Sequence, residues 1–273
     1  DNFRRILPDK TTVYVAHLED TPIEEMFATC KRLISEGMVP MPHIPARIII
    51  DAGELEDWVK EYASLGVDQS LLLAGNGKTP SGELFNSIQL LESGIFEKYS
   101  FKKIQIAGHP EGSKDIQPDG GSKNVSSALS WKQEFSKRTD AQMAIATQFC
   151  FDADTILNWS KRINLEGNKI PIIIGLPGIA KLSTLLKYSL SCGIGNSVNF
   201  LKKQGSNVLN LVRTQEPNDL VRKLSNSEEA LKENNIEGVH IYPLGGIRKS
   251  SDWANAIIDK KIKLTPTGFS VYY

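Results

Sequence analysis

The sequence lacks the features that mark membrane-spanning, secreted and disulfide-stabilised chains. No apolar run among its 273 residues approaches the roughly 18 residues that a membrane span needs. The opening residues, DNFRRILPDK, contain no apolar core of the kind found in a secretory signal. The three cysteines, Cys30, Cys150 and Cys192, are odd in number and show no CxxC spacing, so we expect reduced thiols in a cytoplasmic protein.

Charge of one sign and metal-ligand motifs are lacking as well. Lys and Arg together number 32, and Asp and Glu together number 32, so no net field attracts nucleic acid or an anionic membrane. The four histidines form no HxH or HExxH motif, and we therefore expect no metal site. Hydrophobic residues make up 40% of the chain, which indicates a folded protein with neither nucleic-acid nor membrane partners.

What the sequence does contain is a regular alternation of strand-like and helix-like segments. The expected strands are Val13–Ala16, Met38–His43, Gln69–Leu73, Lys103–Ala107, Met143–Phe149, Ile170–Gly175 and Val239–Leu244. The expected helices are Ile23–Ser35, Glu54–Leu65, Ser87–Ser93, Ser126–Arg138, Thr155–Leu165 and Ser183–Ser191. Strands that alternate with amphipathic helices predict βαβ units and a parallel sheet.

Two parallel architectures fit this alternation. An open doubly wound sheet usually carries GxGxxG after its first strand, and that motif is absent here. A barrel needs eight strands, whereas seven are visible. We therefore predict an α/β fold, a (β/α)8 TIM barrel, forming a single domain over residues 1–273, with its first strand upstream of Asp1. The long interval between Gly175 and Val239 should hold additional helices.

In a barrel the chemistry lies at the carboxyl ends of the strands, and several of these ends carry polar residues. His43 stands between prolines, and Gly75-Asn76-Gly77 lets a backbone approach a ligand closely. His109 and Glu111 suit acid–base chemistry, and Gln148 suits a ring that offers both a donor and an acceptor. Each also has a structural interpretation, as a rim histidine, a plain turn or a buried amide.

Taken in order, six strand-end segments resemble the methylenetetrahydrofolate reductase family. They are Pro42-His43, Leu72-Leu73-Ala74-Gly75-Asn76, Ala107-Gly108-His109-Pro110-Glu111, Thr147-Gln148-Phe149-Cys150-Phe151-Asp152, Ile174-Gly175-Leu176-Pro177-Gly178 and His240-Ile241-Tyr242. The TQFxFD segment is the most telling of them. The resemblance implies a barrel reductase of one-carbon metabolism and methionine biosynthesis. Such an enzyme takes hydride from NADH or NADPH onto FAD, and from the flavin onto 5,10-methylenetetrahydrofolate to give 5-methyltetrahydrofolate.

The resemblance also implies roles for individual residues. His43, Ala74, Gly75, Asn76, His109 and Ser113 would line the flavin, and Lys132 or Lys137 would reach its phosphates. Gln148 would hydrogen-bond the folate substrate, Phe151 and Tyr188 would flank the face where nicotinamide and folate bind, and Tyr242 would close the site.

Some positions depart from the family pattern. The catalytic acid of the family is a Glu on the first barrel strand, which no part of this chain matches, so we name no catalytic acid. Asn76 stands where the family has Asp, and it is the candidate at the catalytic position. Removing that negative charge predicts a more positive flavin potential, since the reduced anion loses a neighbouring like charge.

Other functions stay open beside this one. The chain could reduce the folate without flavin, or bind folate with little reductase activity beside a folate-dependent demethylase or methyltransferase. An unrelated barrel lyase or aldolase would need a Schiff-base lysine at a strand end, and the lysine nearest to one, Lys78, lies within a loop. The aromatic ending TPTGFSVYY could dock on a neighbouring copy in a homo-oligomer.

Overall fold

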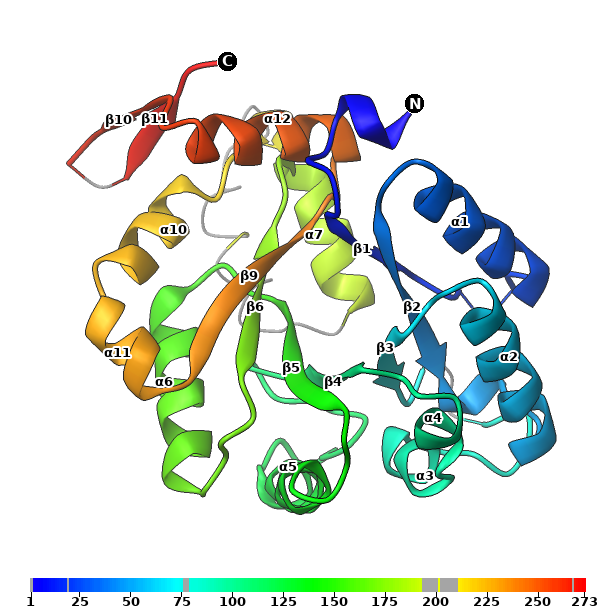
Figure 1. The fold of residues 1–273 in the computed structure, drawn as a ribbon. Helices are drawn as coiled ribbons and strands as arrows, with labels where there is room; N and C mark the ends of the chain where they lie inside the picture. The colour runs from blue at the N-terminus through cyan, green and yellow to red at the C-terminus, as the bar shows by residue number, and fades with distance from the viewer. Residues whose placement is uncertain (1, 19, 76–78, 193–200, 202–210, 267) are drawn as a thin grey trace. The chain divides into compact units, whose positions relative to one another are not determined.

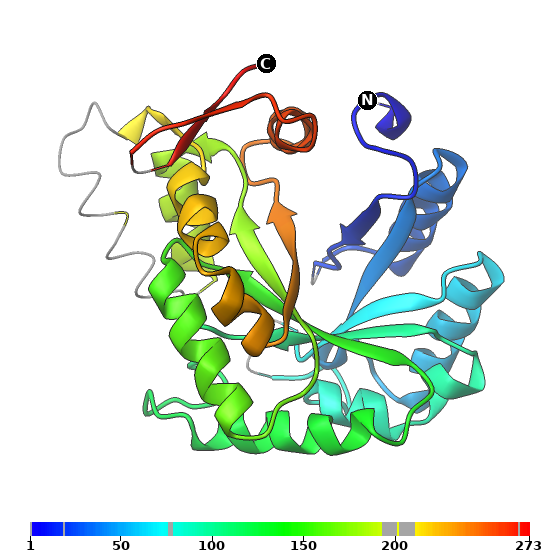
Figure 2. The same ribbon diagram turned by 60° about the vertical axis from the view of Figure 1, so that its left-hand side comes forward.

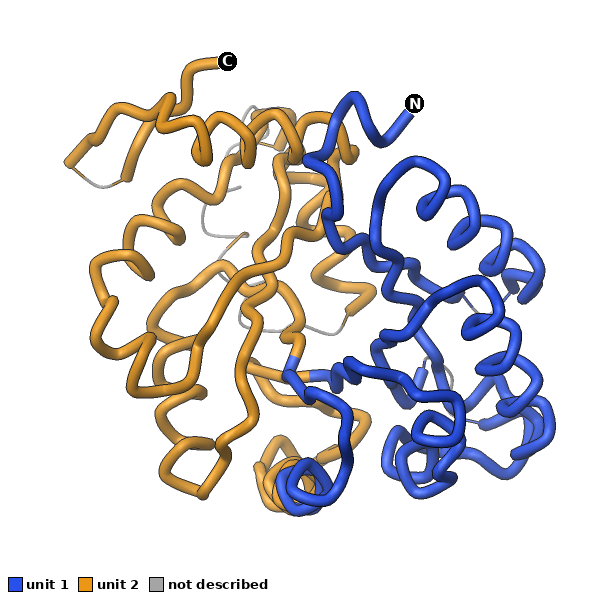
Figure 3. The backbone as a smooth tube through the Cα atoms, in the orientation of Figure 1, with its two compact units in different colours: residues 1–107, 131–145 blue, residues 108–130, 146–273 orange. Residues whose placement is uncertain are grey.

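The computed structural model describes residues 2–18, 20–75, 79–192, 201, 211–266 and 268–273. The chain divides into two compact units, which Figure 3 shows in different colours. Unit 1 comprises Asp1–Ala107 and Trp131–Ile145, and unit 2 comprises Gly108–Ser130 and Ala146–Tyr273.

Seven strands form one sheet, and they follow one another in it in the order of the sequence (Figure 1). They are β1 (Thr12–Val15), β2 (Val39–Pro45), β3 (Gln69–Leu73), β4 (Lys103–Gly108), β5 (Gln142–Phe149), β6 (Ile172–Pro177) and β9 (Ile236–Tyr242). The registers of β1 with β2, β2 with β3, β3 with β4 and β6 with β9 are all parallel. Sequential order is that of a barrel, whereas a doubly wound sheet reverses its order at a switch point. The fold is therefore of the α/β TIM-barrel type, as the sequence predicts.

Helices separate the strands along the chain. They are α1 (Ile23–Ser35), α2 (Ala52–Ser64), α3 (Ser87–Glu92), α4 (Ile95–Lys98), α5 (Lys123–Ser136), α6 (Ala153–Leu165), α7 (Leu182–Ser191), α10 (Asn218–Ser225), α11 (Glu228–Glu233) and α12 (Ile247–Ile258). Two short pairs complete the set, β7 (Ala180–Lys181) with β8 (Thr214–Gln215) and β10 (Ile262–Leu264) with β11 (Phe269–Val271). None of the helices in the described ranges is long and apolar enough to cross a membrane.

The predicted element boundaries hold to within a few residues, and the largest differences have a local cause. We expected a strand from Ile170, but β6 begins at Ile172, because Pro171 has no N–H to donate to a ladder. The Ile172 N–H donates to the Asn235 carbonyl at 2.8 Å. This bond aligns β6 with the residue before β9, and β9 begins at Ile236 rather than at the expected Val239. The interval between β6 and β9 holds the additional helices α10 and α11.

In unit 1, amphipathic helices pack on the strands that they connect. The buried side chains of α1 are Met26, Cys30 and Leu33, a spacing that places them on one face. The α2 helix begins at the Asp51 cap, whose carboxylate accepts from the Glu54 N–H at 2.9 Å.

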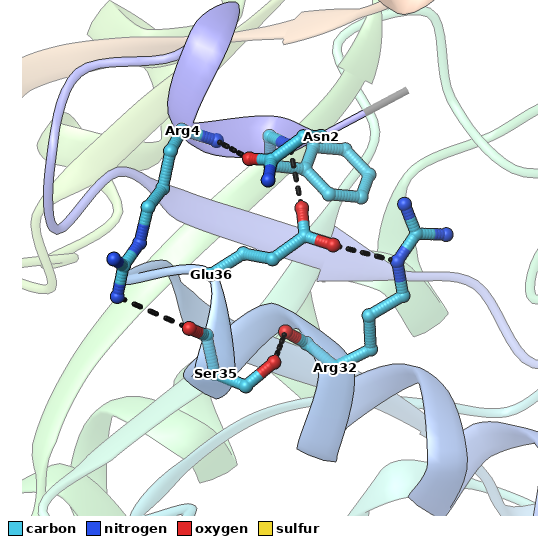
Figure 4. Close-up of polar contacts among 6 residues, drawn as sticks. Asn2, Arg4, Arg32, Ser35 and Glu36 are labelled. Atoms are coloured by element: carbon cyan, nitrogen blue, oxygen red, sulfur yellow. Dashed lines mark hydrogen bonds and ion pairs between the residues drawn. The ribbon is translucent and has the colours of Figure 1, made fainter.

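The N-terminal turn of unit 1, η1 (Phe3–Arg5), is tied to the end of α1 (Figure 4). The Phe3 N–H donates to the Glu36 carboxylate, which also accepts from Arg32 Nε at 2.8 Å. Arg4 donates to the Ser35 carbonyl at 3.1 Å. The bonds from Phe3 and Arg32 lower the pKa of Glu36, with the Phe3 N–H as the largest cause and Arg32 as the next.

In unit 2, α10 and α11 lie beside α6, and α11 also contacts β9 (Figure 2). The C-terminal hairpin β10–β11 is held to α10 through Asn218, which donates to the Phe269 carbonyl at 2.9 Å. The Trp253 indole N–H on α12 donates to the same Asn218 side chain at 2.7 Å. The aromatic C-terminal segment therefore contains β11, the second strand of a hairpin that packs on its own unit.

Candidate functional site

The clearest irregularity of unit 2 lies at the carboxyl end of β5, at the peptide between Thr147 and Gln148. In a regular parallel ladder, the Gly175 N–H of β6 would donate to a backbone carbonyl of β5. Here it donates to the Thr147 hydroxyl at 2.8 Å, and that hydroxyl donates in turn to the Gln148 carbonyl at 2.8 Å. The Thr147 side chain thus takes the place of its own carbonyl in the ladder.

The displaced Thr147 carbonyl is held by two side chains of β9. His240 Nε2 lies 3.0 Å from the Thr147 oxygen, and the Tyr242 hydroxyl donates to the same oxygen at 3.0 Å. To reach β5, both side chains must cross the intervening strand β6. They cross at Gly175, where a Cβ atom would lie 2.6 Å from the Thr147 oxygen and 2.8 Å from Tyr242 Cε2. A glycine at this position is what allows the arrangement.

The protonation of these groups follows from the bonds they make. A carbonyl oxygen only accepts, so His240 Nε2 carries the proton. Burial lowers the pKa of His240 to about 4, against a weaker opposing effect of the Thr147 carbonyl. His240 is therefore neutral at pH 7, with its proton on Nε2.

Aromatic rings surround this end of β5. Phe149 packs edge-on against Tyr242 at 5.2 Å between ring centroids and against Phe151 at 5.9 Å. The His240 and Tyr242 rings lie 4.8 Å apart. Gln148 is half-buried in this stretch, and none of the residues that the structure describes hydrogen-bonds its side-chain amide.

Cys150 follows β5 and lies beside two acidic residues, Glu111 and Asp152, which affect its pKa. Burial raises the pKa of the Cys150 thiol to about 12, and the negative charges of Glu111 and Asp152 act in the same direction. Cys150 is therefore a neutral thiol and no nucleophile. Asp152 caps α6, because its carboxylate accepts from the Thr155 N–H at 2.9 Å and from the Thr155 hydroxyl at 2.7 Å. The described residues contain no group of three or more His, Cys, Asp or Glu side chains that could hold a metal ion.

Of the predicted site residues in unit 2, the structure brings two, Phe151 and Tyr242, together around Phe149. Gln148 directly precedes Phe149 in β5, so its side chain points to the opposite face of the strand. Phe151 also packs against a buried cluster of α7 and its surroundings, formed by Ala180, Leu182, Leu185 and Leu201. Tyr188 lies on α7 with 42% of its surface exposed, and no described ring contact joins it to Phe151.

The residues predicted after β4 lie in a loop of unit 2 with bonds of its own. The His109 carbonyl accepts from the Gly112 N–H at 3.0 Å. The Ser113 carbonyl accepts from the Gln117 N–H at 2.9 Å, and the Ser113 hydroxyl accepts from the Ile116 N–H at 3.4 Å. Glu111 lies in the same loop, and it raises the pKa of Cys150, the residue that follows β5.

The remaining predicted residues belong to unit 1. His43 lies on β2 with its ring edge-on to Tyr14 at 6.1 Å. Ala74 and Gly75 form a turn against β2, where the Arg47 N–H donates to the Ala74 carbonyl at 3.0 Å and a Cβ on Gly75 would lie 2.9 Å from Pro45. Asn76 and Lys78 lie outside the described residues.

The two lysines predicted near the flavin phosphates differ from each other. Lys132 is half-buried on α5, and burial lowers its pKa to about 8. Lys137 follows the end of α5 and is exposed, with its ammonium 2.6 Å from the Glu134 carboxylate. Lys137 is therefore already paired with a carboxylate one turn away.

Sequence reasoning missed the two residues that organise the site, Thr147 and His240. A signal was present, because His240 and Tyr242 stand two apart on one face of a strand. The glycine that lets them cross, Gly175, lies on the neighbouring strand. The pairing could not be found without the register, which aligns Gly175 with His240.

Comparison with known proteins shows no family for this chain. No protein-family model matches the chain. Among similar solved structures, the N-acetylneuraminate lyase of Proteus mirabilis is 12% identical, with 91% of this chain and 70% of that chain covered and a TM-score of 0.40. The N-acetylneuraminate lyase of Mycoplasma synoviae is 9% identical, with 91% and 69% covered and a TM-score of 0.38. The DHDPS of Cyanidioschyzon merolae with lysine bound is 13% identical, with 82% and 67% covered and a TM-score of 0.37.

These findings correct the family assignment made from the sequence. The resemblance to methylenetetrahydrofolate reductases is wrong, because no family model matches and the similar solved structures named above are lyases and a DHDPS. The predicted folate reductase activity, with or without flavin, depended on this resemblance and is wrong as well. The same holds for the alternative of a folate-binding protein. FAD and NADH or NADPH rested on that resemblance alone, and they stay predictions. The chain is a TIM-barrel-type α/β protein for which these comparisons show no activity.

Proposed function

We propose that this protein binds a small, uncharged, planar organic molecule at the carboxyl ends of β5 and β9 in unit 2. The observation that carries the proposal is the Gln148 side-chain amide, half-buried at the carboxyl end of β5 and without a hydrogen-bond partner in the described part of the chain. Such an amide can both donate to and accept from a ligand. The carboxyl ends of barrel strands are also the usual place for ligand sites in this fold.

The electrostatics of these strand ends favour an uncharged ligand. His240 is neutral because burial lowers its pKa to about 4. The Cys150 thiol is neutral as well, and Glu111 contributes a negative charge beside it. An anionic ligand would be desolvated and repelled here, since moving a charge out of water is costly unless it is paired.

The rings favour a flat ligand. Phe151 and Tyr242 are half-buried and pack against the buried ring of Phe149 at the end of β5, and aromatic pairs gain about 0.5–1.5 kcal/mol beyond the area that they bury. A cytoplasmic location belongs to this proposal, since the described cysteines are all free and Cys30 and Cys150 are buried. An association between copies stays a prediction.

Calorimetric titration with benzamide and benzoate tests the proposal, because these two flat molecules differ mainly in charge. We expect benzamide to bind and benzoate to bind at least about tenfold more weakly. The Gln148→Ala variant should lose about five- to tenfold in benzamide affinity, the worth of one hydrogen bond of about 1 kcal/mol.

The matched control is Gln142→Ala, at the exposed start of the same strand. It should leave the affinity for benzamide unchanged. The proposal would be wrong if neither compound binds, if benzoate binds more tightly, or if both variants change the affinity equally.

A further inference from the structure

We infer that the Lys132 side chain is a site of covalent attachment, where its amine forms an imine with a small, uncharged aldehyde or ketone. The inference does not depend on the proposed function, since it concerns the helix α5 alone. It stands on the position of Lys132 along this helix, on its half-buried state and on the charges that its neighbours lack.

Lys132 shares a face of α5 with side chains that are mostly apolar. Residues three and four positions apart in a helix lie on the same face, and for Lys132 these are Ala128, Leu129, Phe135 and Ser136. Phe135 is buried, and the other three are half-buried, as Lys132 is. Lys132 therefore stands on a largely apolar surface that is partly open to solvent, which suits an uncharged carbonyl compound.

The same face offers no counter-charge to the Lys132 ammonium. None of the four neighbours is charged, and the nearest carboxylate in the sequence, that of Glu134, is paired with Lys137 at 2.6 Å. Among the residues that the structure describes, Lys132 has no ion-pair or hydrogen-bond partner. A half-buried cation without a partner is costly, and this cost disfavours the charged form.

The consequence is an amine that is partly neutral at pH 7. Burial lowers the pKa of Lys132 to about 8, so roughly a tenth of this side chain carries a free amine at pH 7. For a lysine with an ordinary pKa, the neutral fraction at this pH is below about 0.1%. Only the neutral amine has a lone pair with which to attack a carbonyl carbon.

The imine forms by addition and loss of water, without an oxidant or a reductant. The amine nitrogen bonds to the carbonyl carbon, and a proton moves from this nitrogen to the former carbonyl oxygen, which gives a carbinolamine. Water then leaves, and a C=N bond joins the Lys132 side chain to the compound.

Reductive trapping of the whole chain tests the inference. The protein is treated with propionaldehyde and cyanoborohydride, and the labelling of each lysine is followed by peptide mass spectrometry. At pH 7 we expect Lys132 to be labelled at least about tenfold faster than the exposed Lys137, because its neutral fraction is larger. The labelling rate of Lys132 should reach half its maximum near pH 8.

Two variants of one neighbour test the role of the missing counter-charge. Ser136→Glu places a carboxylate one turn from Lys132, and Ser136→Gln adds a side chain of similar size without charge. We expect Ser136→Glu to slow the labelling of Lys132 at pH 7 by about twofold or more relative to Ser136→Gln.

Three results would overturn the inference. Lys132 could be labelled no faster than Lys137 in the wild type, or its labelling could show a midpoint near the ordinary lysine value of about 10.4. Equal labelling of Lys132 in the two Ser136 variants would show that the missing counter-charge is not the cause. Benzamide binding by the wild type is measured separately, so the proposed function stands or fails independently of these results.

Discussion

At the scale of single residues, the site depends on Thr147, whose side-chain hydroxyl makes the sheet hydrogen bond that its backbone carbonyl would normally make. The Thr147 hydroxyl bonds to the sheet, and its carbonyl accepts from His240 and Tyr242. The sequence singled out Gln148 because its amide can both donate and accept, and Tyr242 only through the family resemblance. It could not single out Thr147, because its role depends on which backbone N–H lies opposite to it.

The neutral state of His240 predicts how stability depends on pH. Its pKa is about 4 in the folded protein, below the ordinary value of 6.5, so between these values the unfolded chain binds the extra proton. The stabilising contribution is therefore complete above pH 6.5 and is lost as the pH falls from 6.5 through 4. By linkage it amounts to at most about 3.4 kcal/mol.

His240→Gln isolates this effect, because the Gln amide can donate to the Thr147 carbonyl and does not titrate. Urea unfolding at pH 7 and pH 4.5 should show a smaller loss of unfolding free energy for the variant than for the wild type. An identical loss in the two proteins would contradict the assigned state of His240.

At the scale of elements, the site is formed by three neighbouring strands, with β9 reaching across β6 to β5. Gly175 makes this crossing possible, since its missing side chain leaves room for the Thr147 carbonyl and the Tyr242 ring. The turn after β6 contains Gly178, which belongs to one of the segments that resemble the reductase family. In the structure the Gly178 N–H donates to the Tyr242 carbonyl at 2.7 Å, so this glycine joins β6 to β9.

Gly175→Ala should destabilise the protein by about 1–3 kcal/mol, because the added methyl group overpacks the crossing. Gly238→Ala is the matched control, since this glycine also lies in a strand and its added Cβ would meet the Ile173 side chain at an ordinary 3.5 Å. Thermal or urea unfolding of both variants provides the comparison. Equal stability of the two would show that the crossing at Gly175 is not close-packed.

The same scale shows what short motifs can and cannot reveal. Asp152, the last residue of the TQFxFD segment, caps α6 through Thr155. Gly75 is required by its approach to Pro45 and its φ of 92°. Structural needs of this kind recur at the strand ends of unrelated barrels, and they can reproduce part of a family motif without its chemistry.

At the scale of the whole molecule, the fold class could be predicted and the family could not. The spacing of apolar residues reflects the backbone geometry of helices and strands, and it is regular in the seven strands and the amphipathic helices between them. The sequential strand order then distinguished the barrel from the doubly wound sheet. Function lies in the side chains grafted on such a fold, and here those that matter are brought together by register rather than by sequence proximity.

The measurement that tests the central claim most directly is an NMR titration of the nitrogen-15-labelled protein with benzamide, covering backbone and glutamine side-chain amides. The Gln148→Ala spectrum assigns the Gln148 side-chain signals. The account predicts that these signals show the largest changes, together with backbone signals of Thr147 and Tyr242, while the Gln142 side chain stays unchanged. Saturable shifts elsewhere with the Gln148 side chain unmoved, or no shifts at all, would contradict it.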